Sequence, residues 1–154
     1  MKKLSQKIDD LDEDLIRFAR FNFLVMARVS IFVVYFWFGL LKVFSASPAN
    51  PLVSELLSHV LPFMAFSDFI FVFGIFEMII GIIFVIPRLE RPAIFLLILH
   101  LATTVMPLFI LPQVAWQGFL VPTLEGQYII KNILLISLAM GLGAHLHFLR
   151  KHRE

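Results

Sequence analysis

The sequence predicts an all-α integral membrane protein, built as an antiparallel four-helix bundle with a short cytoplasmic helix at its N-terminus. Of the 154 residues, 60% are hydrophobic, whereas soluble domains average about 45–50%. Four apolar runs are long enough to cross the hydrocarbon core of a membrane, which takes about 20 helical residues. These runs are Phe21–Phe44, Phe63–Ile86, Ala93–Leu111 and Tyr128–Phe148. Backbone groups in hydrocarbon must pair within their own segment, so each run predicts a helix.

The chain divides into a cytoplasmic amphipathic N-terminal segment (residues 1–20), a four-span membrane domain (21–148) and a basic cytoplasmic tail (149–154). In the first segment, apolar side chains recur in steps of four and three residues, which places them on one face of a helix. They are Leu4, Ile8, Leu11, Leu15 and Phe18. This helix is either solvated or lies in the membrane interface. Five acidic residues between positions 9 and 14 favour the solvated interpretation.

Lysine and arginine are distributed unevenly around the four runs. Eleven of the 13 lie before or at the start of the first run, between the second and third, or after the fourth. Lys42 and Lys131 lie at the opposite ends of the first and fourth runs. The positive-inside rule therefore predicts that both termini are cytoplasmic. No cleavable signal-peptide pattern precedes the first run, so we expect that run to stay as an anchor.

The first run carries a polar stripe. Arg28, Phe32, Tyr35, Gly39 and Lys42 are spaced by four, three, four and three residues and share one helix face. This face packs against other helices, or Arg28 and Lys42 extend to the two membrane interfaces. They lie about 21 Å apart along a helix, which permits the second arrangement.

The second run contains a carboxylic acid in its middle. Gly74, Glu77 and Gly81 share a face, and the glycines allow a close helix contact there. A carboxyl in hydrocarbon costs about 2.5 kcal/mol or more on insertion scales. We therefore expect Glu77 to be buried against other helices. We expect Asp68, with Ser67, to cap the start of this helix.

The third run places His100, Thr103, Thr104 and Pro107 on one face. This pattern indicates either a kinked packing face with a hydrogen-bonded histidine or a ligand or proton site. We expect His100 to be buried as well.

Several kinds of chemistry have no residues to support them. The chain has no cysteine, which excludes thiol exchange and Fe–S ligation. The sequence shows no metal-ligand, nucleotide-binding or Ser–His–Asp spacing. Haem ligation needs two histidines at one depth, and His100 and His145 differ by roughly 7 Å of helix rise. Independent catalytic activity is therefore the least favoured function.

The candidate ligand-binding residues are the polar groups within and at the outer ends of the runs: Tyr35, Lys42, Glu77, His100, Glu125, Lys131 and Asn132. Lys42 and Lys131 lie near the outer surface, and Glu77 lies roughly 10 Å deeper along the membrane normal. We therefore expect these lysines to pair with Glu125 or Asp68. Glu77 would then be hydrogen-bonded by neutral donors such as Tyr35, Asn132 or a threonine.

Three stretches resemble the DoxX-like membrane family and its YkgB-type neighbours. They are FWFGLLKVF (Phe36–Phe44), GIFEMIIGI (Gly74–Ile82) and PTLEGQYIIKNILL (Pro122–Leu135). The resemblance implies a four-helix fold in a bacterial inner membrane and a link to membrane redox and oxidative stress. The positions that match the family's motifs are Lys42, Glu77, Glu125, Lys131 and Asn132.

We expect a protein that binds a small ligand, a quinone or a polar solute, or that serves as an accessory to a membrane redox partner. A quinone is the one cofactor we consider. One alternative is a small proton-coupled transporter or channel acting as a homo-oligomer. Another is a structural partner subunit. We expect no nucleic-acid partner.

Overall fold

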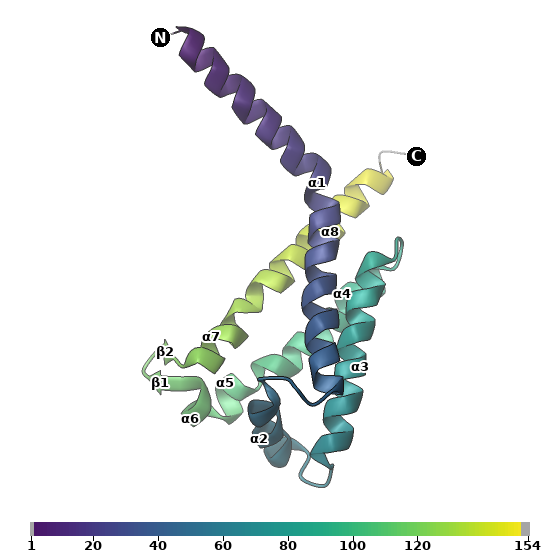
Figure 1. Cartoon of the computed structure of the whole chain (residues 1–154), viewed down its shortest axis with the longest axis vertical. Coiled ribbons are helices and arrows are strands. Elements are labelled where there is room, and N and C mark those ends of the chain that lie inside the picture. The colour runs from purple at the N-terminus through teal and green to yellow at the C-terminus, as the bar shows by residue number, and fades with distance from the viewer. Residues whose placement is uncertain (1, 152–154) are drawn as a thin grey trace.

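A computed structural model describes the backbone of residues 2–151 and the side chains of residues 11–144. The side chains of Leu4, Ile8 and His145 therefore lie outside the described residues. The elements in chain order are α1 (Lys2–Val43), α2 (Asn50–Val60), α3 (Phe66–Val85), α4 (Glu90–Val105), α5 (Pro107–Ile110), α6 (Pro112–Ala115), β1 (Trp116–Gly118), β2 (Val121–Pro122), α7 (Leu124–Lys131) and α8 (Ile133–Lys151). Figure 1 shows their arrangement.

Four helical segments are long and apolar enough to cross a membrane. They are Leu11–Val43, Phe66–Val85, Glu90–Ile110 and Leu124–Ala144. The expectation of four apolar helices that are long enough to cross a membrane is thus confirmed. The first segment differs from the prediction in one respect, because the N-terminal helix and the first span are a single helix of 42 residues.

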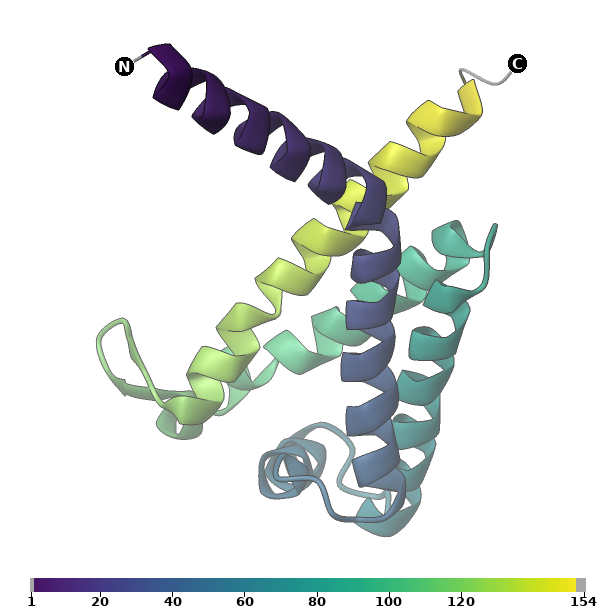
Figure 2. The same cartoon turned by 45° about the horizontal axis from the view of Figure 1, so that its top comes forward.

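The C-terminal part of α1 lies beside α3 (Figures 1 and 2). A Cβ atom added at Gly39 would lie 2.5 Å from the Gly74 carbonyl oxygen, and one at Gly81 would lie 3.0 Å from the Phe36 nitrogen. Side chains at these positions would force the two backbones apart. The prediction that glycines allow a close contact at the Glu77 face is confirmed.

One buried apolar cluster draws residues from α1, α3, α4 and α8. Ile31, Ile80, Phe84, Leu97 and Leu142 are fully buried within it. Many large apolar side chains on the outer surfaces of the same helices are exposed, as lipid-facing positions require. The helices therefore share one core, with a second apolar surface outside it.

Helix α3 continues beyond the end of α1 (Figure 1). A Cβ atom added at Gly74 would lie 3.0 Å from both Lys42 Cβ and Val43 N, the last two residues of α1. The end of α1 is therefore level with the middle of α3, and residues 66–73 extend past it.

The connections contain several local features. Met106 separates α4 from α5, which begins at Pro107, and a turn at Asn132 separates α7 from α8. A two-stranded antiparallel sheet, β1–β2, pairs Trp116 with Pro122, which an all-α fold did not predict. The predicted cap by Asp68 is wrong. The residue before α3 is Ala65, no side chain caps the helix, and Ser67 instead donates to Asp68 at 3.4 Å.

Arg28 connects α1 to the residues on either side of the α3–α4 connection. Its guanidinium pairs with Glu90 and donates to the carbonyl oxygens of Phe84 and Val85, at 3.3 and 3.5 Å. These carbonyls lie in the last turn of α3, where no further helical N–H reaches them. Glu90 also accepts the Arg88 backbone N–H at 3.0 Å. Arg28 thus packs between helices, as the first of the two interpretations required.

Replacing Arg28 with methionine is expected to destabilise the fold by about 2 kcal/mol, because it removes charge-assisted hydrogen bonds from partly buried acceptors. The matched control is Arg17→Met. Arg17 lies 4.0 Å from Asp14 in a solvent-exposed pair, and such pairs contribute about 0–1 kcal/mol. Thermal unfolding in detergent, followed by circular dichroism, measures both. Equal stability of the two variants would contradict the role given to Arg28.

Candidate functional site

Glu77 joins three helices at the centre of the structure. It lies midway along α3 and is 4% exposed. One carboxylate oxygen accepts a hydrogen bond from Lys42 Nζ of α1 at 2.6 Å. The other is 2.8 Å from His100 Nε2 of α4. Lys42 and His100 are buried too, at 6% and 4% exposed.

Tyr35 extends this cluster by one more hydrogen bond. Its hydroxyl lies 3.2 Å from His100 Nδ1. Tyr35 and Lys42 are seven residues apart on α1, so the same helix face supplies both ends of the cluster. We call these four residues, Tyr35, Lys42, Glu77 and His100, the buried polar network.

The partners define the proton positions on the histidine ring. A carboxylate paired with a lysine ammonium only accepts hydrogen bonds. His100 Nε2 therefore carries a proton and donates a hydrogen bond to Glu77. In the neutral ring Nδ1 is then the acceptor, and Tyr35 donates to it. The result is a continuous chain of hydrogen bonds from tyrosine to lysine.

The aromatic ring of Phe73 packs against two members of the network. Phe73 stacks on His100, with ring centroids 5.1 Å apart and planes at 22°. The same ring lies under Lys42, with Nζ 5.6 Å from its centroid. Phe73 precedes Glu77 by one helical turn. Phe73 was not among the candidates predicted from the sequence, although its spacing of four residues from Glu77 places both on one helix face. Lys42 and Glu77 are almost fully buried, so their charges depend on each other for compensation.

The predicted partner of Lys42 was wrong. Lys42 pairs with Glu77 and not with Glu125 or Asp68. Glu77 therefore has a lysine as partner, where neutral donors such as Tyr35 or Asn132 were expected. The expectation assumed that α1 and α3 end at the same depth on the outer side. Because α1 ends level with Gly74, Lys42 is one turn from Glu77 and reaches it directly. The predicted burial of Glu77 and His100 is confirmed.

The other candidates from the sequence lie elsewhere. Glu125 and Lys131 are exposed on α7, where the Lys131 ammonium lies over the Tyr128 ring at 5.3 Å. Asn132 is half-buried at the turn between α7 and α8. Within residues 11–144, no ion pair or hydrogen bond connects these three side chains to the buried polar network. The structure therefore brings together four of the seven candidates.

The two threonines near Pro107 are satisfied within their own helix. Thr103 donates to the His100 carbonyl at 2.6 Å, and Thr104 donates to the Leu101 carbonyl at 3.0 Å. Their hydroxyls point to the helix backbone, as in the packing interpretation of this face. The network therefore takes only His100 from α4.

The Lys42 ammonium has more donors than the network uses. It carries three N–H groups, and among the described side chains Glu77 is its one hydrogen-bond acceptor. Two donors of a buried cation thus remain for other acceptors. Nearby in the chain, after the turn that ends α1, Asn50 Oδ1 is buried without a hydrogen-bond partner among the described residues.

No protein-family model, curated protein or solved structure matches this chain. Its function has to be inferred from its own residues.

Proposed function

We propose that this chain is a membrane protein that binds a small ligand through acceptor oxygens, and that the ligand is of the quinone class. Its apolar helices would form an antiparallel bundle in a bacterial inner membrane, with both termini in the cytoplasm. The observation that carries the proposal is Lys42, a cation 6% exposed with one hydrogen-bond acceptor for three donors. Ionisable residues inside a membrane domain mark functional sites by default.

Quinone chemistry fits the groups around this lysine. A quinone carbonyl is an acceptor that matches an ammonium donor, and the bond would be charge-assisted. Phe73 lies beside Lys42 and stacks on the imidazole ring of His100. An aromatic side chain next to the ammonium could also pack against the planar ring of a quinone. Glu77 holds the ammonium in place and neutralises it.

Equilibrium binding tests this proposal. A short-tailed benzoquinone is titrated into purified protein in detergent, and quenching of Trp37 and Trp116 fluorescence reports binding. The informative variant is Lys42→Met/Glu77→Leu, which removes both charges together and keeps the interior apolar. We expect saturable binding by the wild type and a loss of about 10–100-fold in the variant, the value of a charge-assisted hydrogen bond.

The matched control is Arg28→Met/Glu90→Leu, which removes a different ion pair, the one between α1 and α4, and leaves the buried polar network unchanged. It is expected to bind the quinone as the wild type does. Equal binding by all three proteins would refute the site. Benzoate serves as a second probe, and displacement of quinone by benzoate at the same site would indicate a site for polar solutes.

A proton-coupled carrier is the second candidate, and the unbroken chain of Tyr35, His100, Glu77 and Lys42 favours it. Such a chain of ionisable groups inside a membrane is typical of proton relays. Liposomes containing the protein and a pH-sensitive dye measure this function directly. We expect Glu77→Gln to abolish any proton flux, because the amide cannot take up a proton. A flux that persists in this variant would exclude the network as its path.

A further inference from the structure

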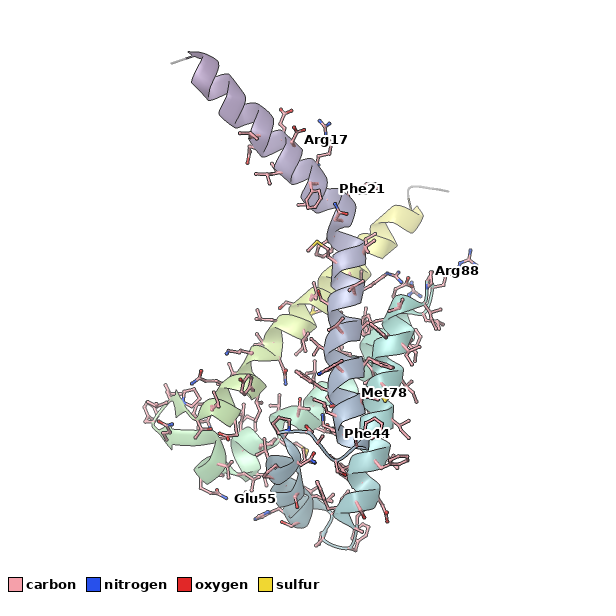
Figure 3. All side chains as sticks on the ribbon, in the orientation of Figure 1. Arg17, Phe21, Phe44, Glu55, Met78 and Arg88 are labelled. Carbon is pink, nitrogen blue, oxygen red and sulfur yellow. The ribbon has the colours of Figure 1, made fainter. Side chains whose placement is uncertain are left out.

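The N-terminal part of α1 extends away from the other helices. Figures 1 and 2 show it projecting beyond α3 and α4, and Arg17 and Phe21 lie on the projecting part (Figure 3). Helix α1 has 42 residues, which at 1.5 Å per residue is about 63 Å. A hydrocarbon core takes about 30 Å of this. Roughly half of the helix therefore lies outside a bilayer.

An uncovered apolar stripe runs along this projecting part. Leu11, Leu15 and Phe18 are 64%, 65% and 63% exposed, and Val25 continues the stripe at 62%. The first buried side chain described on α1 is Ala27, where the helix meets the core. The stripe is thus separate from the surface that α1 uses within the molecule.

The stripe has a heptad pattern. Leu4, Leu11 and Phe18 occupy position d, and Ile8, Leu15 and Asn22 occupy position a. Position d thus holds two leucines and a phenylalanine, and position a holds an isoleucine, a leucine and an asparagine. A β-branched residue at a with leucine at d favours two parallel strands, and a single asparagine at a specifies register and pairing. We propose that residues 4–22 pair with the same segment of a second copy of this chain as a parallel two-stranded coiled coil.

The charges next to the stripe are complementary between two copies. Lys7 occupies position g and Asp12 occupies position e of the following heptad. In a parallel coiled coil, g of one strand faces this e position of the other, so each pair of copies has two such ion pairs. The acidic residues around Asp12 oppose the alternative partner, an anionic lipid surface.

Anchoring in the membrane supplies the rest of the driving force for dimerisation. An isolated helix of three heptads is marginal in water. Two copies anchored in one bilayer share an orientation, and their tethering raises the effective concentration of each segment for the other. The dimer involves no residue of the buried polar network, so it stands independently of the ligand proposal.

Cysteine cross-linking tests the dimer without disulfides from native residues, because the chain has no cysteine. Leu11→Cys, Phe18→Cys and Glu13→Cys are made singly in the full chain, and membranes are treated with a mild oxidant. Leu11 and Phe18 lie at position d, whereas Glu13 lies at position f on the opposite face. We expect disulfide-linked dimers for both d positions and at least tenfold less for Glu13→Cys. Self-cross-linking at two positions two turns apart requires strands that run in the same direction.

Absence of dimers at both d positions, or equal dimers at all three, would overturn the proposal. A Leu11→Cys thiol that forms no dimer and is shielded from a membrane-impermeant maleimide would place the stripe on lipid instead. The charge pairs give a second check. Asp12→Lys is expected to lower the dimer fraction, and Lys7→Glu added to it is expected to restore most of the loss. A double variant no better than Asp12→Lys would refute the predicted register.

Discussion

Replacing Lys42 with methionine is expected to destabilise the protein by about 3–5 kcal/mol, because it leaves the Glu77 carboxylate buried without a compensating cation. The complementary change, Glu77→Leu, leaves the Lys42 ammonium buried without a compensating anion. It should lower the stability by a similar amount. The Lys42 and Glu77 side chains are only 8% and 6% exposed, so water cannot compensate either charge. Thermal unfolding in detergent, with and without each substitution, measures the loss.

The double variant Lys42→Met/Glu77→Leu should recover most of this stability, since replacement of a whole buried ion pair by apolar groups is often neutral or stabilising. The stability losses of the single variants would then be strongly non-additive, as expected for residues in contact. Additive losses, with the double variant the least stable, would show that Lys42 and Glu77 do not depend on each other. The same double variant serves the binding experiment because it keeps the fold.

The second large effect concerns the contact between α1 and α3. Gly39→Ala should destabilise the protein by about 3 kcal/mol, the upper end of the usual cost of overpacking. The new Cβ would lie 2.5 Å from the Gly74 carbonyl oxygen and 2.9 Å from the Met78 nitrogen. Both are backbone atoms, so no side-chain rotation relieves the clash. Alanine exceeds glycine in helix propensity by about 1 kcal/mol, so a net loss reports packing alone.

Gly118→Ala is the matched control for this substitution. No atom lies within 4 Å of a Cβ added at Gly118, and its backbone is not in the left-handed region. Its stability should stay within about 0.5 kcal/mol of the wild type. If Gly39→Ala were as stable as Gly118→Ala, the close approach of α1 and α3 would be wrong. The position of Lys42 beside Glu77 would then be wrong as well, because the same contact sets it.

The sequence was sufficient to predict which residues of α1, α3 and α4 turn inward. Glu77 and His100 are expensive in lipid, and the glycines flanking Glu77 identify the packed face. Hydropathy and helix period alone therefore predicted the burial of both side chains. They also placed Tyr35 and Lys42 on one face of α1, which is the face that meets Glu77 and His100.

The relative depth of two helices could not be predicted in this way. Hydropathy gives the length of each apolar run but not the register between neighbours, which depends on how glycine and side-chain surfaces interlock. The assumption that the outer ends are level put Lys42 about 10 Å from Glu77. The contact of Gly39 with Gly74 removes that gap. The pairing of Arg28 with Glu90 was missed for a similar reason, since it depends on the conformation of the short α3–α4 connection.

The central claim is that Lys42, held by Glu77, donates a hydrogen bond to a ligand carbonyl. Infrared spectroscopy of a bound benzoquinone carrying ¹³C-labelled carbonyls tests it most directly. A hydrogen bond from an ammonium weakens the carbonyl bond. We therefore expect a lower carbonyl stretching frequency for the quinone bound to the wild type than for the same quinone in detergent micelles without protein. The shift should persist in Arg28→Met/Glu90→Leu and disappear in Lys42→Met/Glu77→Leu. A carbonyl frequency that is the same in all three proteins and in micelles would contradict the account.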